Sequence, residues 1–154
     1  MNVVANSTGL APACDALNYP LCRITELADV FAPRADGGIL DRTGVVDVFN
    51  CLRRPEEASF GGGVFVVVRC GDAVTWELLR GKGHVVSRNG KYAAIFLPYH
   101  LMGVETPVSL LSAVAHGRAS SSDRANVHAV MVARTGRDFA AGETLRMGGH
   151  HHVM

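Results

Sequence analysis

The polar residues best suited to chemistry gather around the end of one predicted strand. Lys91–Leu97 is a strand candidate that Pro98 ends, and Tyr99, His100 and then Glu105 follow it. An imidazole and a carboxylate spaced in this way can orient a polar substrate or transfer a proton. The same two side chains can instead hydrogen-bond to satisfy a buried turn, with Glu105 favoured by the positive end of a helix. Spacing alone leaves both interpretations open.

Two other motifs suggest binding but lack the context that binding needs. Gly61-Gly62-Gly63 precedes an apolar run, whereas a phosphate loop follows a strand and opens a helix, so the glycines predict a turn. His150-His151-His152 offers two imidazoles on one face of a strand, but no third ligand of suitable spacing accompanies them. We therefore expect no metal site and no complete nucleotide-binding unit.

Composition excludes several classes of protein. The chain has 154 residues, 48% of them apolar and 19% charged, with a net charge of +1. These values exclude a disordered chain and fit one domain, or one domain plus part of another. Because the only basic doublet is Arg53-Arg54, we expect no nucleic-acid partner.

Neither a membrane nor an oxidising compartment is indicated. No apolar run approaches the roughly 20 residues that span a bilayer, and the run Val64–Val68 stops at Arg69. The first residues do not form a signal peptide. Four scattered cysteines without a CxxC pair predict reduced thiols rather than a disulfide pair, and hence a cytoplasmic protein.

Local signals place the elements that must position the polar residues. Gly9 ends an opening helical turn, Thr25 caps a short helix through Phe31, and Asp72 caps a helix that Gly81 stops. Thr106-Pro107 begins another helix, which Gly117 closes. Strands are expected over Val64–Val68, buried on both faces, over Lys91–Leu97 and over Val127–Ala133, with a turn at residues 140–143.

These elements predict an α+β fold: a mixed sheet with short helices, followed by a partial, small all-β module. The small polar residues 119–124 are the best linker in the chain. We therefore expect a first domain over residues 1–118 and the start of a second over residues 125–154.

Several stretches resemble one family in order and spacing along nearly the whole chain. They are similar to the homoserine dehydrogenase-like NAD(P)-dependent oxidoreductases that end in a SAF (β-clip) domain, a group that includes reductoisomerase-like enzymes acting on a deoxyxylulose phosphate. The stretches are Ala5–Leu10, Asp36–Leu40 with Gly44–Asp47, Gly63–Val68, Pro98–Leu101 with Glu105–Pro107, and Arg137–Leu145 with Gly148-Gly149. The most specific is Pro98–Leu101 with Glu105–Pro107.

The resemblance implies that the chain is a fragment. Such proteins begin with a Rossmann domain that carries a glycine fingerprint, and their catalytic lysine and aspartate lie upstream of the segment matching Ala5–Leu10. Residues 1–118 then correspond to the later part of the central domain, and residues 125–154 to the first part of the SAF module. The chain departs from the family at His150–His152, where an aromatic strand is usual, and at residues 51–60, where an insertion is longer.

The resemblance also implies a parent enzyme that uses NAD(P) on a small hydroxylated or phosphorylated metabolite. This chain would supply the substrate-side wall and a surface for homo-oligomers, hold no cofactor by itself and have no activity alone. The expected catalytic residues are His100, Glu105 and Lys91, and the expected substrate-binding residues are Asn6, Thr8 and Tyr99. The alternatives are a non-catalytic SAF-type module for ligand binding or assembly, and a small metal-binding protein that uses His150–His152.

Overall fold

A computed structural model describes residues 1–120, 122 and 126–144 of the chain. Its α-helices are α1 (Asn2–Thr8), α2 (Leu27–Val30), α3 (Ala73–Gly81) and α4 (Met102–His116), and short 3-10 turns cover Ile24–Glu26 and Arg34–Asp36. Its strands are β1 (Ala11–Pro12), β2 (Leu21–Cys22), β3 (Val45–Val46), β4 (Asn50–Cys51), β5 (Val64–Arg69), β6 (Val85–Val86) and β7 (Tyr92–Leu97). The α+β class predicted from the sequence is confirmed.

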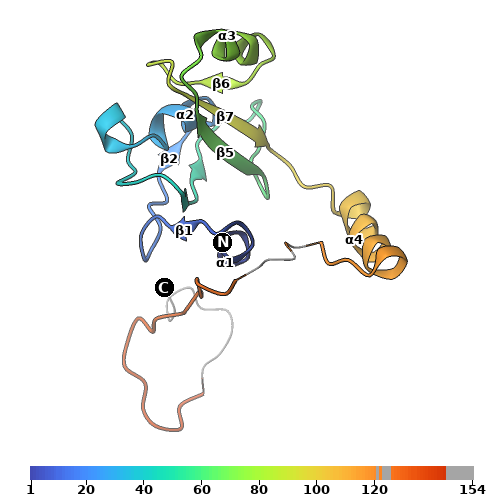
Figure 1. Cartoon of the computed structure of the whole chain (residues 1–154). Coiled ribbons are helices and arrows are strands. Elements are labelled where there is room, and N and C mark those ends of the chain that lie inside the picture. The colour runs from blue at the N-terminus through green and yellow to red at the C-terminus, as the bar shows by residue number, and fades with distance from the viewer. Residues whose placement is uncertain (121, 123–125, 145–154) are drawn as a thin grey trace.

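The main sheet has three antiparallel strands in the order β5-β7-β6, and the other strands form the parallel pairs β1-β3 and β2-β4. In Figure 1 α3 lies at one end of the main sheet, beside β6, and α1 lies below, near β1. β7 is the central strand, so the residues before and after it lie at opposite ends of the sheet.

The core forms where α2 packs against β7. Leu27, Ala28 and Phe31 of this helix are buried together with Tyr92 and Ala94 of the strand. Ring contacts among Phe31, Phe49, Phe60, Phe65 and Phe96 extend this core along β5 and β7. Offset and edge contacts of this kind add to the free energy gained from burial alone.

The prediction that β5 is covered on both faces is wrong. Phe65 and Val67 pack against the core, but the side chains of Val64 and Val66 are 61% and 50% exposed. β5 is an edge strand of an antiparallel sheet, and such sheets commonly pack on one face only. A run of β-branched residues therefore did not reveal which face meets the core.

Several helix ends agree with their sequence signals. Gly9 and Gly117 follow α1 and α4 in the left-handed conformation, with φ of 76° and 62°. A carboxylate oxygen of Asp72 accepts a hydrogen bond from Val74 N–H at 3.1 Å and caps α3. Thr25, by contrast, is not a cap, because Arg23 precedes the 3-10 turn that leads into α2.

Helix α4 begins earlier than its Thr106-Pro107 motif predicts. The helix starts at Met102, and Pro107 lies inside it. A carboxylate oxygen of Glu105 accepts a hydrogen bond from Leu101 N–H at 3.2 Å, which supports a turn ahead of the proline. In Figure 1 α4 stands apart from the sheet, joined to β7 by an extended segment.

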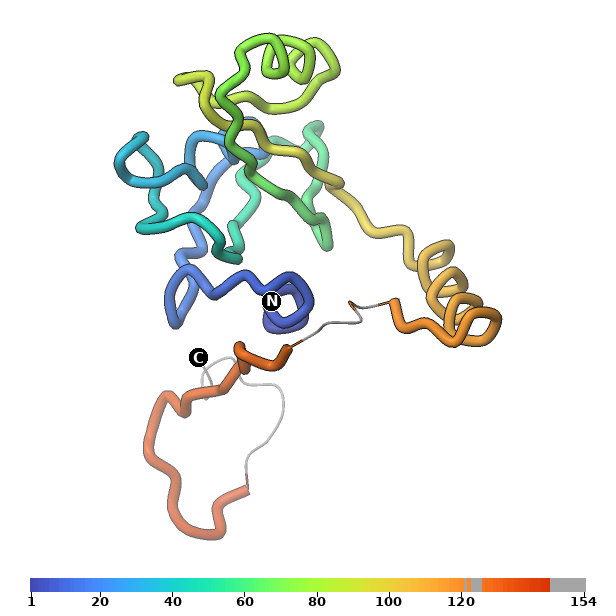
Figure 2. The backbone as a smooth tube through the Cα atoms, viewed as in Figure 1, coloured from blue at the N-terminus to red at the C-terminus, as the bar shows by residue number. Residues whose placement is uncertain are grey.

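The predicted strand over residues 127–133 is also not a strand. Residues 126–129 pass beside α1 (Figure 2) and are held by hydrogen bonds to Asn6, so the chain direction is set by side-chain contacts rather than by strand pairing. The predicted turn at residues 140–143 is present, with Gly142 at φ 85°. Gly148, Gly149 and His150–His152 lie outside the described residues, and the domain boundaries at 118 and 125 stay a prediction.

No helix in the described part of the chain is long and apolar enough to cross a membrane.

Candidate functional site

His100 and Glu105 are in contact with each other between the end of β7 and the first turn of α4. Nδ1 of His100 contacts Oε2 of Glu105, while Oε1 of Glu105 accepts the hydrogen bond from Leu101. The two side chains are 58% and 49% exposed, so they do not satisfy a buried turn. A carboxylate that fixes one imidazole nitrogen leaves Nε2 available to a solute, which is the geometry for proton transfer.

The glycine turn before β5 lies against this pair. Gly62 has φ 81°, and a Cβ added to it would lie 3.4 Å from Cβ of His100. A Cβ at Gly63 would come within 2.7 Å of the Leu97 carbonyl oxygen and of the Phe60 ring. The glycines therefore form a turn, as predicted, and their lack of side chains lets the backbone approach the end of β7 closely.

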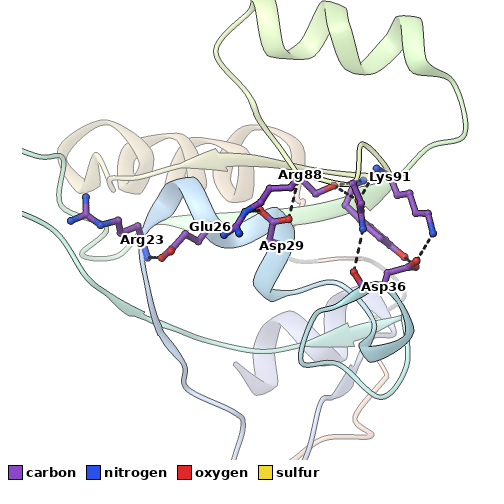
Figure 3. Close-up of polar contacts among 9 residues, drawn as sticks. Arg23, Glu26, Asp29, Asp36, Arg88 and Lys91 are labelled. Atoms are coloured by element: carbon purple, nitrogen blue, oxygen red, sulfur yellow. Dashed lines mark hydrogen bonds and ion pairs between the residues drawn. The ribbon is translucent and has the colours of Figure 1, made fainter.

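Lys91 lies at the opposite end of β7 and does not join His100. The six residues of β7 separate the two side chains, which corresponds to about 20 Å of strand. Nζ of Lys91 lies 2.5 Å from Oδ1 of Asp36 (Figure 3). The Tyr92 hydroxyl donates to Oδ2 of the same carboxylate at 2.6 Å. The hydrogen bonds from Lys91 and Tyr92 lower the pKa of Asp36, and the bond to Asp36 raises the pKa of Tyr92.

A second set of polar contacts joins the segment between β6 and β7 to α2. The backbone N–H of Arg88 donates to Oδ1 of Asp29 at 3.0 Å, and its guanidinium lies 3.6 Å from Oδ2 (Figure 3). Glu26 accepts a hydrogen bond from the backbone N–H of Arg23 at 2.7 Å. Lys91 and Arg88 thus belong to a group of contacts that hold the 3-10 turn Arg34–Asp36 and α2 against β7 and the residues just before it.

Asn6 and Thr8 lie on α1 and bond to the protein itself. Oδ1 of Asn6 accepts hydrogen bonds from the N–H groups of His128 and Ala129, at 3.0 and 2.9 Å, and its Nδ2 donates to the Ala129 carbonyl at 3.0 Å. The Thr8 hydroxyl donates to the Val4 carbonyl at 2.7 Å. Both residues line a polar pocket of about 510 Å³, away from the His100–Glu105 pair. Tyr99 is exposed beside His100.

His128 is a polar residue that the sequence did not single out. Its Nδ1 lies 2.9 Å from the Asn126 carbonyl oxygen and its Nε2 lies 3.0 Å from the Leu10 carbonyl oxygen. Both acceptors favour a ring that carries two protons, so hydrogen bonding, first to Leu10 and then to Asn126, raises the pKa of His128. Leu10 and His128 are far apart in the chain, and no local pattern predicts their contact.

No cluster of three metal-ligating side chains occurs among residues 1–120, 122 and 126–144. His150–His152, the only candidates that the sequence offered, lie outside this part.

Comparison with known proteins identifies the class of this chain. Residues 1–106 match the family described as the catalytic domain of the oxidoreductase DRL. This match covers more than two thirds of the 154 residues, and the protein belongs to that oxidoreductase family. The matched region includes β7, His100 and Glu105. No curated protein matches the chain at a significant level.

Proposed function

We propose that the chain is part of an NAD(P)-dependent, homoserine dehydrogenase-like oxidoreductase and forms the substrate-side wall of its active site. The observation that carries this proposal is the exposed His100–Glu105 pair, which lies within the family match and beside a glycine turn. The substrate class is a small hydroxylated or phosphorylated metabolite. A cytoplasmic location accompanies the proposal, in keeping with cysteines that are free thiols.

The residues of this chain do not by themselves fit a dinucleotide. The sequence contains no G-x-G-x-x-G fingerprint between a strand and a helix, which is the motif by which Rossmann domains hold a pyrophosphate. We therefore assign NAD(P) binding to another domain of a longer enzyme, of which this chain would be the central part and the beginning of a SAF module. We expect the chain alone to hold no cofactor and to show no turnover.

Within this proposal His100 is the residue that moves a proton. Glu105 holds Nδ1, which leaves Nε2 to accept the proton of a substrate hydroxyl. The hydride from the carbon of that hydroxyl would go to NAD(P)+, which the proposal assigns to another domain. Tyr99, exposed on the neighbouring position, provides a further hydrogen-bonding group for the substrate. The positions of Lys91, Asn6 and Thr8 favour structural roles for these three residues.

A thermal-shift screen against sugar phosphates and hydroxy acids tests the proposal. We expect a ligand of this class to raise the Tm of the chain, and His100→Ala and Glu105→Gln to abolish the shift. His116→Ala is the matched control, because it removes an exposed imidazole from the other end of α4. A Tm shift that survives His100→Ala contradicts the proposal that this chain forms the substrate-side wall. Turnover of NAD(P)H by this chain alone contradicts the proposal that it is one part of a longer enzyme.

A non-catalytic assembly module is the second candidate, and α4 favours it. Large apolar side chains along this helix are 53–86% exposed, namely Leu101, Met102, Val104, Val108, Leu110, Leu111 and Val114. No charged residue interrupts the helix from Thr106 to Ala115. Exposed apolar surface of this extent is typical of an interaction site.

Sedimentation velocity separates the two candidates. Concentration-dependent dimers without any ligand response favour the assembly module, and Val114→Asp is expected to abolish them. A monomer that responds to ligand favours the substrate wall and contradicts assembly through α4.

A further inference from the structure

Two of the four cysteines face each other across a strand pair. β2 and β4 are parallel, and their register places Cys22 directly opposite Cys51. Hydrogen bonds from Asn50 N–H to the Pro20 carbonyl at 2.8 Å, and from Leu52 N–H to the Cys22 carbonyl at 2.9 Å, fix this register. Neighbouring strands lie about 4.8 Å apart, and disulfides join Cα atoms about 4.4–6.8 Å apart.

The two thiols differ in access. Cys22 is 3% exposed and belongs to the core cluster around α2. Burial raises the pKa of its thiol to about 11, with further contributions from Glu26 and Cys51.

Cys51 is accessible from solvent. It is partly exposed and lines a surface pocket of about 270 Å³ together with Arg23, Arg53, Glu57 and Phe96. Arg23 is paired with Glu57 at 2.8 Å, whereas Arg53 donates to backbone carbonyls, which do not neutralise its charge. The pocket therefore offers a small anionic oxidant both a route to Cys51 and a cationic neighbour.

We propose that Cys22 and Cys51 form a redox-sensitive dithiol site that a small-molecule disulfide converts into a Cys22–Cys51 disulfide. The Cys51 thiolate attacks one sulfur of the oxidant, forming a mixed disulfide and releasing one thiolate. Cys22 then gives up its proton and attacks the Cys51 sulfur, which releases the second thiolate. Two protein thiols are oxidised by two electrons, and one disulfide is reduced to two thiols.

The bond would change the stability of the chain. It would close the loop from residue 22 to residue 51, which contains α2 and part of the core. A closed loop restricts the unfolded chain more than the folded one, so the oxidised protein is expected to have the higher Tm.

The test uses the full chain with Cys14→Ser and Cys70→Ser, which leaves only the facing pair. These substitutions are mild, because a serine hydroxyl can replace the contacts of Cys14 with Asn18 and of Cys70 with the Asp72 N–H. The probe is oxidised glutathione, and the readouts are free thiols counted after denaturation, intact mass, peptide mapping and Tm. We expect both thiols to be lost, the mass to fall by two hydrogens, and Tm to rise and return when dithiothreitol is added.

Two further variants in the same background test the order of the steps. With Cys22→Ser, Cys51 is expected to accumulate glutathione as a stable mixed disulfide. With Cys51→Ser, Cys22 is expected to keep its thiol, since it is buried. Circular dichroism verifies that each variant folds. If the Cys51→Ser variant does not fold, Cys51→Ala takes its place.

The proposal is overturned if the folded Cys14→Ser/Cys70→Ser variant keeps both thiols in excess oxidised glutathione. It is also overturned if Cys22 reacts with oxidised glutathione as fast as Cys51 does. A third result that overturns it is a map of the unsubstituted chain in which Cys14 or Cys70 takes part in the disulfide that forms.

Discussion

Replacing Asn6 by alanine should detach residues 126–129, which follow the polar linker, from helix α1. The Asn6 amide makes three hydrogen bonds with the backbone of His128 and Ala129, at 2.9–3.0 Å, whereas the bond from Asn126 N–H to the Asn6 carbonyl is independent of the side chain. At about 1 kcal/mol for each bond, the loss is about 3 kcal/mol of local stability. Because about 1.4 kcal/mol is a factor of ten, the segment should open roughly 150 times more often.

Hydrogen exchange measures this opening at the residues concerned. We expect the amides of His128 and Ala129 to exchange roughly 150-fold faster in Asn6→Ala, because the exchange of a protected amide follows the population of its open form. Val3→Ala is the control, since Val3 lies exposed on the same helix. Amides inside β7, such as that of Ala94, should be unchanged in both variants.

The opposite outcome would refute the structural role of Asn6. Exchange at His128 and Ala129 that is the same in Asn6→Ala and in the parent chain, with α1 still folded, would mean that the amide does not hold this segment. Asn6 would then again be a candidate for substrate binding, as the sequence suggested.

Three other predictions concern a histidine, a core leucine and a proline. Hydrogen bonds to Leu10 and Asn126 raise the pKa of folded His128, so its contribution to stability is complete below the unfolded pKa and is lost as pH rises through the folded one. Urea unfolding between about pH 5.5 and 8.5 should show this decline, and His128→Gln should remove it; a decline that persists in the variant contradicts the assignment. Leu27 is 0% exposed, so Leu27→Ala should lower the free energy of unfolding by about 2–5 kcal/mol, followed by the fluorescence of Trp76. Leu21→Ala, at an exposed leucine, should change it by less than about 0.5 kcal/mol, and equal losses would be inconsistent with this core. Pro107→Ala should stabilise α4 by up to about 3 kcal/mol, because Pro107 lies inside the helix and lacks an N–H for the Gly103 carbonyl. The helical signal in circular dichroism should therefore persist to higher temperature, and an unchanged melting curve would mean that α4 begins at Thr106, as the sequence motif indicates.

Local sequence signals predicted those parts of the fold that depend on a few neighbouring residues. Gly9 and Gly117 end helices because they adopt positive φ, and Asp72 caps α3 because its carboxylate reaches a nearby N–H. β7 and the turn at residues 140–143 were predicted in the same way. The strand expected over residues 127–133 failed, because an apolar run does not indicate whether a partner strand is present.

The candidate site was predictable only in part. The proximity of His100 and Glu105 follows from a spacing of five residues across a strand end and a helix start, and the structure has this pair. Lys91 is close to His100 in the chain, but the extended strand β7 lies between them and places Lys91 at the other end of the sheet. Its partner, Asp36, comes from a different turn.

The sequence by itself determined the α+β class, several helix ends and the His100–Glu105 pair, because each depends on composition or on side chains a few positions apart. Only the tertiary structure decided that β5 is covered on one face, that Asn6 and His128 hold a distant segment, and that Cys22 faces Cys51. Contacts between residues far apart in the chain depend on how the elements pack, and a linear pattern does not specify that packing.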